Sequence, residues 1–392
     1  MPYVELVEGI HYLLDGTWNA SKSIRDEFDG APAPGSIAET EVATGEEGPG
    51  GPWGSEPALT AFSFVTMANF AAADHLGCLA VLITPRGLGG IFGPLVLARA
   101  CIEACARSWW LADPDLGVRE RVGRSFRVRL RSVDDSIHLI KELLAGAPLR
   151  ERAGVSDGGH ERLMKDLYEQ FERRAEILDQ ALRRGLPVHR DDEGAPSGMN
   201  VAMPNNAKLV GELLEDSSSM GSAMYVLLSG ITHTTPSALM RYFDRVDSDD
   251  AELAHLAPDF SNDSLLGTTV ILLSAYVNAF SRLVCLFGWN EERWVGWVDE
   301  AKRTLIEIGE RLENTGQATA PVPIAFDKAG RNSPCPCGSG KKFKYTPMPR
   351  PRHASPGVWR SGPSACSQEK SAPERPWPLE RPWPPSTPAA TP

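Results

Sequence analysis

The sequence lacks the excess of basic residues that a general nucleic-acid-binding protein needs. Its 40 lysines and arginines are outnumbered by 51 aspartates and glutamates, and the formal net charge is −11 over 392 residues. A surface that follows a phosphate backbone requires positive charge concentrated on one face. Contact with nucleic acid is therefore expected only at a local basic cluster, and residues 119–131 are the one candidate.

The sequence also has few cysteines, and they are irregularly spaced. The seven cysteines do not form the evenly paired framework of a secreted domain. Residues 1–15 show neither the basic start nor the apolar run of a cleavable signal. These absences predict a reducing, cytoplasmic setting.

No long apolar stretch is free of polar interruptions. The nearest approach to a membrane span is 265–289, which Asn278 and Arg282 interrupt. We expect a buried core helix there and no membrane partner.

Strand signals are missing as well, because no alternating apolar segments are joined by hairpin turns. Helical spacing and breaks predict an all-α helical bundle. Its helices are expected near 56–83, 91–111, 118–144, 160–184, 207–230, 236–245, 262–288 and 291–315, with an irregular loop at 185–205. The predicted organisation is a short N-terminal element (1–30), a flexible acidic linker (31–58), a helical domain (59–316), a second linker (317–330), a metal motif (331–345) and a tail (346–392).

The tail differs in kind from the rest of the chain. It is dense in proline and repeats Glu-Arg-Pro-Trp-Pro at 374–378 and 380–384. Proline removes backbone donors, and little apolar surface is available to offset the entropy of ordering. We predict a disordered Pro-rich C-terminal tail.

The run Pro334-Cys-Pro-Cys-Gly-Ser-Gly-Lys-Lys-Phe-Lys344 carries a metal-binding pattern. It resembles the SEC-C motif, a small zinc-binding C-terminal module of the preprotein translocase motor that is also appended to many other bacterial proteins. The resemblance implies that Cys335 and Cys337 are two of four zinc ligands, that Lys341, Lys342 and Lys344 form a basic face, and that the module docks a protein partner.

The second ligand pair of that motif is missing from this chain. Thr346 and Pro347 stand where the family has Cys-Cys or Cys-His. Structural zinc is held by four ligands in a closed tetrahedron, so zinc is expected to be weakly bound or absent. Metal-free disorder, ligands from elsewhere including a second chain, and a site completed by His353 and Cys366 remain open. We hypothesise that the reading frame shifts near codon 345.

Two sets of polar residues at helical spacing are candidate ligand-binding groups. Arg99, Glu103 and Arg107 recur every four residues within an apolar helix, which predicts either an anion-binding pocket or an internal salt-bridge network. Tyr225 and Ser229 show the same spacing and lead to His233. That histidine is either a general base near Ser229 or a loop residue before a helix that starts with Thr234, Thr235 and Pro236.

The basic cluster at 119–131 supplies a further candidate. Arg131 and His138 resemble the Arg-to-His spacing of HEPN-type helical ribonucleases, which implies catalysis at a dimer cleft. The alternative is a solvated helix face whose arginines pair with Glu120, Asp134 and Asp135.

The helical region as a whole resembles uncharacterised helical bacterial domains, and that resemblance implies no reaction. No phosphate loop, dinucleotide turn or nucleophile elbow is present in the sequence. Two functional hypotheses follow: a cytoplasmic binding or adaptor protein with a degenerate SEC-C motif, and a HEPN-like ribonuclease acting through Arg131 and His138. The sequence leaves open whether the chain is an enzyme.

Overall fold

The computed structural model describes residues 3–49, 51–84, 87–88, 92–146, 158–215, 221–239, 243–246, 255–258 and 262–314. The fold is all-α, as predicted. Its helices are α1 (Tyr3–Glu27), α2 (Ile37–Thr44), α3 (Glu56–Leu82), α4 (Phe92–Leu111), α5 (Val118–Ala145), α7 (Gly158–Arg183), α8 (Asn206–Leu214), α9 (Gly221–Thr232), α10 (Pro236–Leu239), α11 (Asn262–Phe287) and α12 (Glu291–Asn314).

Short antiparallel ribbons connect some of these helices. The pairs are β1 (Glu47–Gly48) with β2 (Gly51–Pro52), β3 (Ile83–Thr84) with β4 (Gly87–Leu88), β5 (Val188–Arg190) with β6 (Pro196–Met199), and β7 (Phe243–Val246) with β8 (His255–Pro258). The loop predicted at 185–205 therefore contains a hairpin. The single helix predicted at 207–230 is two, α8 and α9, and the helix predicted at 236–245 ends at Leu239.

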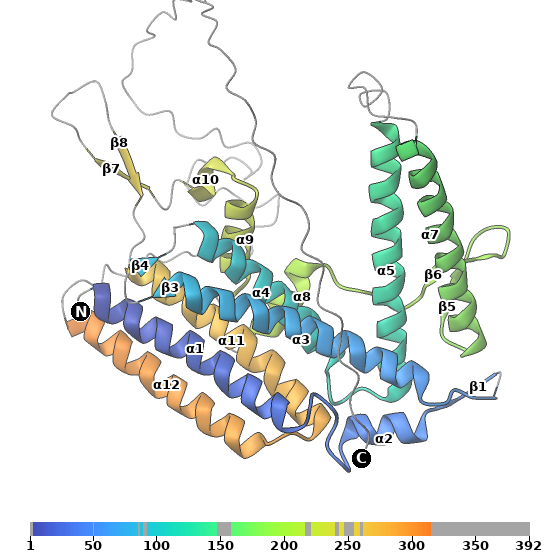
Figure 1. Ribbon diagram of the computed structural model, residues 1–392, viewed down its shortest axis with the longest axis horizontal. Helices are drawn as coiled ribbons and strands as arrows, with labels where there is room; N and C mark the ends of the chain where they lie inside the picture. Colours follow the sequence, from blue (N-terminus) through green and yellow to red (C-terminus); the bar gives the residue numbers. More distant parts are fainter. Residues whose placement is uncertain are drawn as a thin grey trace, which may run out of the picture. The chain divides into compact units, whose positions relative to one another are not determined.

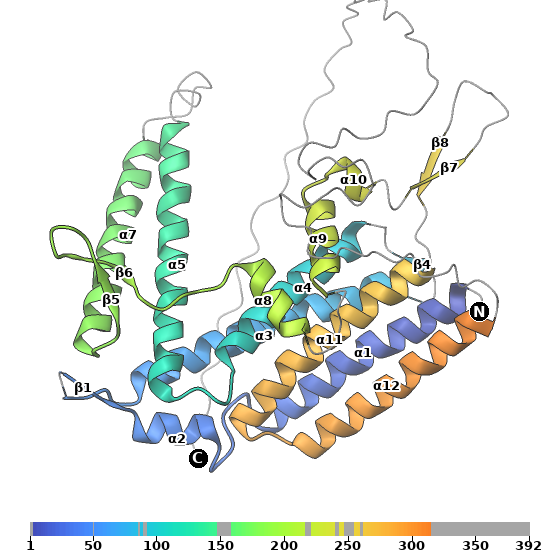
Figure 2. The same cartoon turned by 180° about the vertical axis from the view of Figure 1, so that it is seen from behind.

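The main core is formed by α1, α3, α4, α8, α9, α11 and α12, and α1, α11, α12 and α3 run side by side in both views of the ribbon (Figures 1 and 2). Tyr276 and Phe280 of α11 are fully buried in it. A second cluster of buried side chains lies under the α5–α7 hairpin and includes Phe126, Ile177 and Met199. These two cores position α5 beside the bundle.

The core accommodates the polar residues that interrupt α11. The Asn278 amide donates to the carbonyl of Leu213 at 3.0 Å, and Arg282 lies 3.8 Å over the ring of Trp109. By length and composition alone, α3 and the Ser264–Phe287 part of α11 would each be able to cross a membrane, with 39% and 61% of the apolar window buried. For α11 the predicted core helix is observed.

The flexible linker predicted for residues 31–58 is corrected by the structure, because α2 lies within it. Ser36 caps α2 by accepting from the backbone N–H of Glu39 at 3.1 Å, and the Glu39 carboxylate accepts from the backbone N–H of Gly35 in return. This is close to the reciprocal arrangement of a capping box. Residues 36–39 carry the Ser-x-x-Glu signature of a helix start, which the Gly and Pro residues around them obscure.

The first and last described helices pack antiparallel against each other. The Tyr12 hydroxyl donates to Glu300, the Trp297 indole N–H donates to the Thr17 hydroxyl at 3.1 Å, and Arg293 donates to Ser23 at 2.8 Å. On α1, Gly16 faces the ring of Trp297 so closely that a side chain at this position would overlap the indole. Close helix approach therefore requires glycine here.

A buried ion pair fixes the corner between α4 and α5. Arg121 is fully buried, and its Nε and Nη2 donate to the two carboxylate oxygens of Glu41 on α2 at 2.9 and 3.2 Å. Its remaining N–H groups donate to the carbonyls of Leu111, Asp113 and Leu116 at 2.8, 3.0 and 3.2 Å. All five donors of the guanidinium are thereby satisfied without water.

We predict that Arg121→Met lowers the free energy of unfolding by about 3–5 kcal/mol, because it leaves a buried carboxylate and three carbonyls without donors. Urea unfolding followed by circular dichroism measures the loss. Arg131→Met is the matched control, since its ion pair with Asp135 is more than half exposed on both sides and is worth at most about 1 kcal/mol. Equal losses in the two variants would contradict the assigned role of Arg121.

Candidate anion-binding cavity

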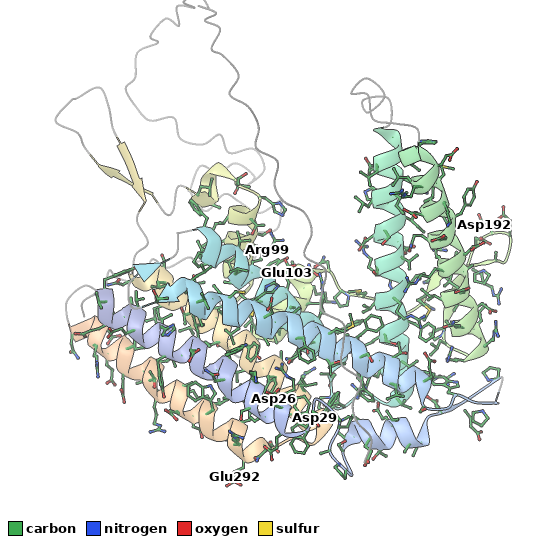
Figure 3. All side chains as sticks on the ribbon, in the orientation of Figure 1. Asp26, Asp29, Arg99, Glu103, Asp192 and Glu292 are labelled. Atoms are coloured by element: carbon green, nitrogen blue, oxygen red, sulfur yellow. The ribbon has the colours of Figure 1, made fainter. Side chains whose placement is uncertain are left out.

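The three polar residues predicted to share one face of α4 differ in their contacts. Arg99 and Glu103 lie one turn apart and point toward each other (Figure 3), with Arg99 Nε donating to Glu103 Oε1 at 2.8 Å. Their side chains are only 16% and 17% exposed. Arg107, one turn further along, is exposed and has no hydrogen-bond or ion-pair partner among the described residues.

Glu103 is the centre of a polar network between three helices. Its Oε1 also accepts from the hydroxyl of Tyr225 on α9 at 3.0 Å, and its Oε2 accepts from the side-chain amide of Asn206 on α8 at 2.9 Å. Burial raises the pKa of Tyr225, and the neighbouring Glu103 carboxylate raises it further. Glu103 thus holds the start of α8 and the middle of α9 against α4.

A cavity of about 950 Å³ opens beside this network, between α4, α5, α8 and α9. Four of the predicted candidates line it together, namely Arg107, Arg131, Tyr225 and Ser229, whereas Arg99 and Glu103 are not among its lining residues. The full set of lining residues is Arg107, Arg127, Val128, Arg131, Ser132, Asp135, Ser136, Leu139, Met203, Pro204, Asn205, Asn206, Ala207, Tyr225 and Ser229.

The lining carries an excess of positive charge. It contains three arginines and one carboxylate, and that carboxylate, Asp135, is paired with Arg131 at 3.0 Å. Arg127, like Arg107, makes no ion pair or hydrogen bond within the described part of the chain. Two guanidinium groups therefore line the cavity without a counter-charge from the described residues.

The structure shows no side-chain hydrogen bond between His233 and Ser229. His233 is exposed, and its Nε2 lies 3.5 Å from Arg99 Nη1. Its contact with Ser229 is the backbone hydrogen bond of a helix end, from His233 N to Ser229 O at 3.0 Å. The next helix begins at Pro236 after Thr234 and Thr235, as the alternative interpretation predicted.

Arg131 and His138 both lie exposed on α5, but only Arg131 lines the cavity. Arg131 Nε donates to Asp135 at 3.1 Å. The ribonuclease role of this pair stays a prediction.

Two further arginines of the 119–131 cluster, Arg119 and Arg124, form ion pairs. Arg124 donates to Glu120 at 2.9 Å, as expected for a paired helix face. Asp134 is instead bound by Arg174 of α7 at 2.8 Å, which the sequence of α5 alone could not show. Arg119 pairs with Glu46 at 3.0 Å.

Two cavity residues, Arg127 and Asn206, were not singled out from the sequence. The Asn205-Asn206 pair is a helix-start signal, and Asn205 does cap α8 by accepting from the backbone N–H of Lys208 at 2.9 Å. Arg127 lies four residues before Arg131, so helical spacing placed both on one face of α5.

The predicted zinc ligands Cys335 and Cys337, and the predicted disordered tail, lie outside the described residues. Within the residues that the structure does describe, no group of three or more His, Cys, Asp or Glu side chains is arranged to hold a metal ion. Cys101 and Cys105 are buried in the main core, and burial raises the pKa of Cys105.

Comparison with known protein families identifies a SEC-C motif at residues 331–345. This agrees with the resemblance carried by Cys335 and Cys337. Comparisons of the chain with curated proteins and with solved structures gave no match.

We predict that Glu103→Gln lowers the pKa of Tyr225, because it removes a negative charge that disfavours the phenolate. Ultraviolet titration of each protein against its Tyr225→Phe counterpart isolates this one tyrosine. Glu313→Gln, an exposed change on α12, is the control and leaves the titration unaltered. An unchanged Tyr225 titration in Glu103→Gln would rule out the network as described.

Proposed function

We propose that the chain is a binding protein whose cavity between α4, α5, α8 and α9 holds a small anionic ligand. The observation that carries this proposal is the pair of arginines, Arg107 and Arg127, which line the cavity without partners among the described residues. A guanidinium presents planar, bidentate donors that match a phosphate or a carboxylate. Unpaired cations around a concave site favour an anion as the missing partner.

The net charge of the protein strengthens this interpretation. The chain as a whole carries −11, so an excess of positive charge in one cavity is a local departure. Anions are repelled by the average surface and attracted to this site, which favours selective over non-specific binding.

The start of α8 adds uncharged hydrogen-bond donors to the cavity lining. Asn205, Asn206 and Ala207 line the cavity at the first turn of this helix. The backbone N–H groups of Asn206 and Ala207 have no intrahelical acceptor, and the helix dipole favours negative charge at this end. Ser229 of α9 also lines the cavity, and its hydroxyl has no hydrogen bond to a described residue.

Binding is favoured over catalysis by what lines the cavity. No histidine or cysteine is among the described lining residues, and the one carboxylate is tied to Arg131. The remaining titratable group, Tyr225, already donates a hydrogen bond to Glu103, and burial raises its pKa. General acid–base chemistry needs a titratable group within hydrogen-bonding reach of the substrate. The arginines bind and orient an anion but do not exchange protons near neutral pH.

Inorganic phosphate is the simplest probe of this proposal. We expect isothermal titration calorimetry to detect phosphate binding that weakens about tenfold or more in Arg107→Ala and in Arg127→Ala, since each loses a charge-assisted contact. Arg311→Ala, an exposed arginine on α12, removes the same charge and leaves the affinity unchanged. Equal weakening in all three variants would show a general charge effect, and no phosphate binding by the parent protein would refute the proposal.

A second candidate role is favoured by the SEC-C motif at 331–345. Modules of this kind are zinc-associated, and an intact one would present the basic face of Lys341, Lys342 and Lys344 to a protein partner. The donor set does not complete a zinc site, because Thr346 and Pro347 supply no thiolate or imidazole. We therefore propose adaptor function only for a form of the chain that regains the second ligand pair. The cytoplasmic setting stays a prediction.

We predict that the purified chain retains well below one zinc per molecule after dialysis. Metal analysis should show that Thr346→Cys combined with Pro347→Cys raises the content to about one, because four thiolates then close the tetrahedron. Zinc held tightly at one equivalent by the unaltered chain, and lost in Cys335→Ser, would contradict this expectation.

A further inference from the structure

A second cavity adjoins the first at Arg127 and Met203, which line both. It has a volume of about 490 Å³ and lies between α5, α7 and the β5–β6 hairpin. Its lining residues are Arg127, Leu130, Asp134, Arg174, His189, Ser197, Gly198, Met199, Asn200, Val201, Ala202 and Met203. Arg127 and Met203 therefore lie at the boundary between the two cavities.

The second cavity differs from the first in its charge. Arg174 is neutralised by Asp134 at 2.8 Å and also donates to the carbonyl of Ser197 at 2.6 Å. The side chains of His189 and Asn200 supply hydrogen-bonding groups without partners among the described residues. Apart from Arg127, which both cavities share, and Ser197, the rest of the lining consists of glycine and apolar side chains. Such a lining suits an uncharged chemical group with polar edges rather than a second anionic group.

The wall of this cavity is fixed rather than loosely attached. Met199 at the end of β6 is 5% exposed and belongs to the core cluster beneath α5 and α7. The contact from Arg174 to Ser197 ties β6 to α7. The hydrogen bond from Asn200 N to Pro187 O, at 2.9 Å, closes the base of the hairpin. The backbone that carries the exposed side chains of His189 and Asn200 is thus fixed before any ligand binds, which lowers part of the entropic cost of recognition.

From this arrangement, and resting on the anion-binding function proposed above, we infer that the ligand is a nucleotide. Its phosphate lies against Arg107, Arg127 and Arg131, and its nucleoside occupies the second cavity. Arg174 uses N–H groups at the edge of its guanidinium to bind Asp134 and Ser197, so the planar face of the guanidinium is left for stacking on a base. His189 and Asn200 then bind the polar edge of the base or the sugar hydroxyls. The volume lies within the range of small-molecule sites.

The test compares three probes by calorimetry at one salt concentration: inorganic phosphate, a set of nucleoside 5′-monophosphates, and the corresponding nucleosides. We expect at least one nucleotide to bind about tenfold or more tightly than phosphate, since stacking and polar contacts add to the phosphate contacts. His189→Ala and Asn200→Ala should each weaken nucleotide binding about five- to tenfold and leave phosphate binding unchanged. Arg127→Ala should weaken both.

His160→Ala, at an exposed position on α7 outside both cavities, is the matched control and leaves all affinities as they were. Phosphate and every nucleotide binding with equal affinity would overturn the nucleotide assignment while the anion site stands. Nucleotide affinity that is insensitive to both His189→Ala and Asn200→Ala would overturn it as well. Absence of any phosphate or nucleotide binding would refute the anion-binding function itself.

Discussion

The guanidinium of Arg121 places all five of its N–H groups on protein acceptors, and much of the cavity geometry depends on that arrangement. Three acceptors are carbonyls at the end of α4 and in the turn that follows it, and the other two are the oxygens of Glu41 on α2. The direction in which α5 leaves the bundle is therefore set at its first turn. Arg127 and Arg131 lie about two and three turns further along the same rigid helix. Their approach to Arg107 of α4 is a consequence of a contact that neither of them makes.

Glu103 has the corresponding role on the opposite wall. It receives hydrogen bonds from Arg99, Tyr225 and Asn206, so its carboxylate joins α4, α8 and α9 through one buried charge. A buried carboxylate is stable only when its acceptor sites are occupied by good donors, and here three side chains supply them. The network keeps the Glu103 carboxylate out of the cavity lining, in which the one carboxylate, Asp135, is paired with Arg131. Selectivity for an anion depends on that separation as much as on the arginines.

Local sequence signals predicted the long helices well, and they predicted part of the site. The spacing of Arg99, Glu103 and Arg107 correctly placed these residues on one face of α4, and the polar interruptions of α11 proved compatible with a core helix. The signals failed where a short element depends on distant partners. The composition of residues 31–58 favours a linker over α2, because the ion pair that fixes this helix joins Glu41 to Arg121, 80 residues away. The pairing of Asp134 with Arg174 and the role of Arg127 likewise follow from how α5 packs on α7 and faces α8, which no spacing within one helix reveals.

The antiparallel packing of α1 on α12 brings the two ends of the described helical unit to the same edge of the fold. Each of these helices covers apolar side chains of the other and of the shared core, among them Leu6 and Ile10 on α1 and Ile308 and Leu312 on α12. Unfolding of one of these helices therefore exposes apolar side chains on the other, so the two helices should unfold together as one cooperative unit. Proteolytic removal of either helix would therefore also destabilise the other.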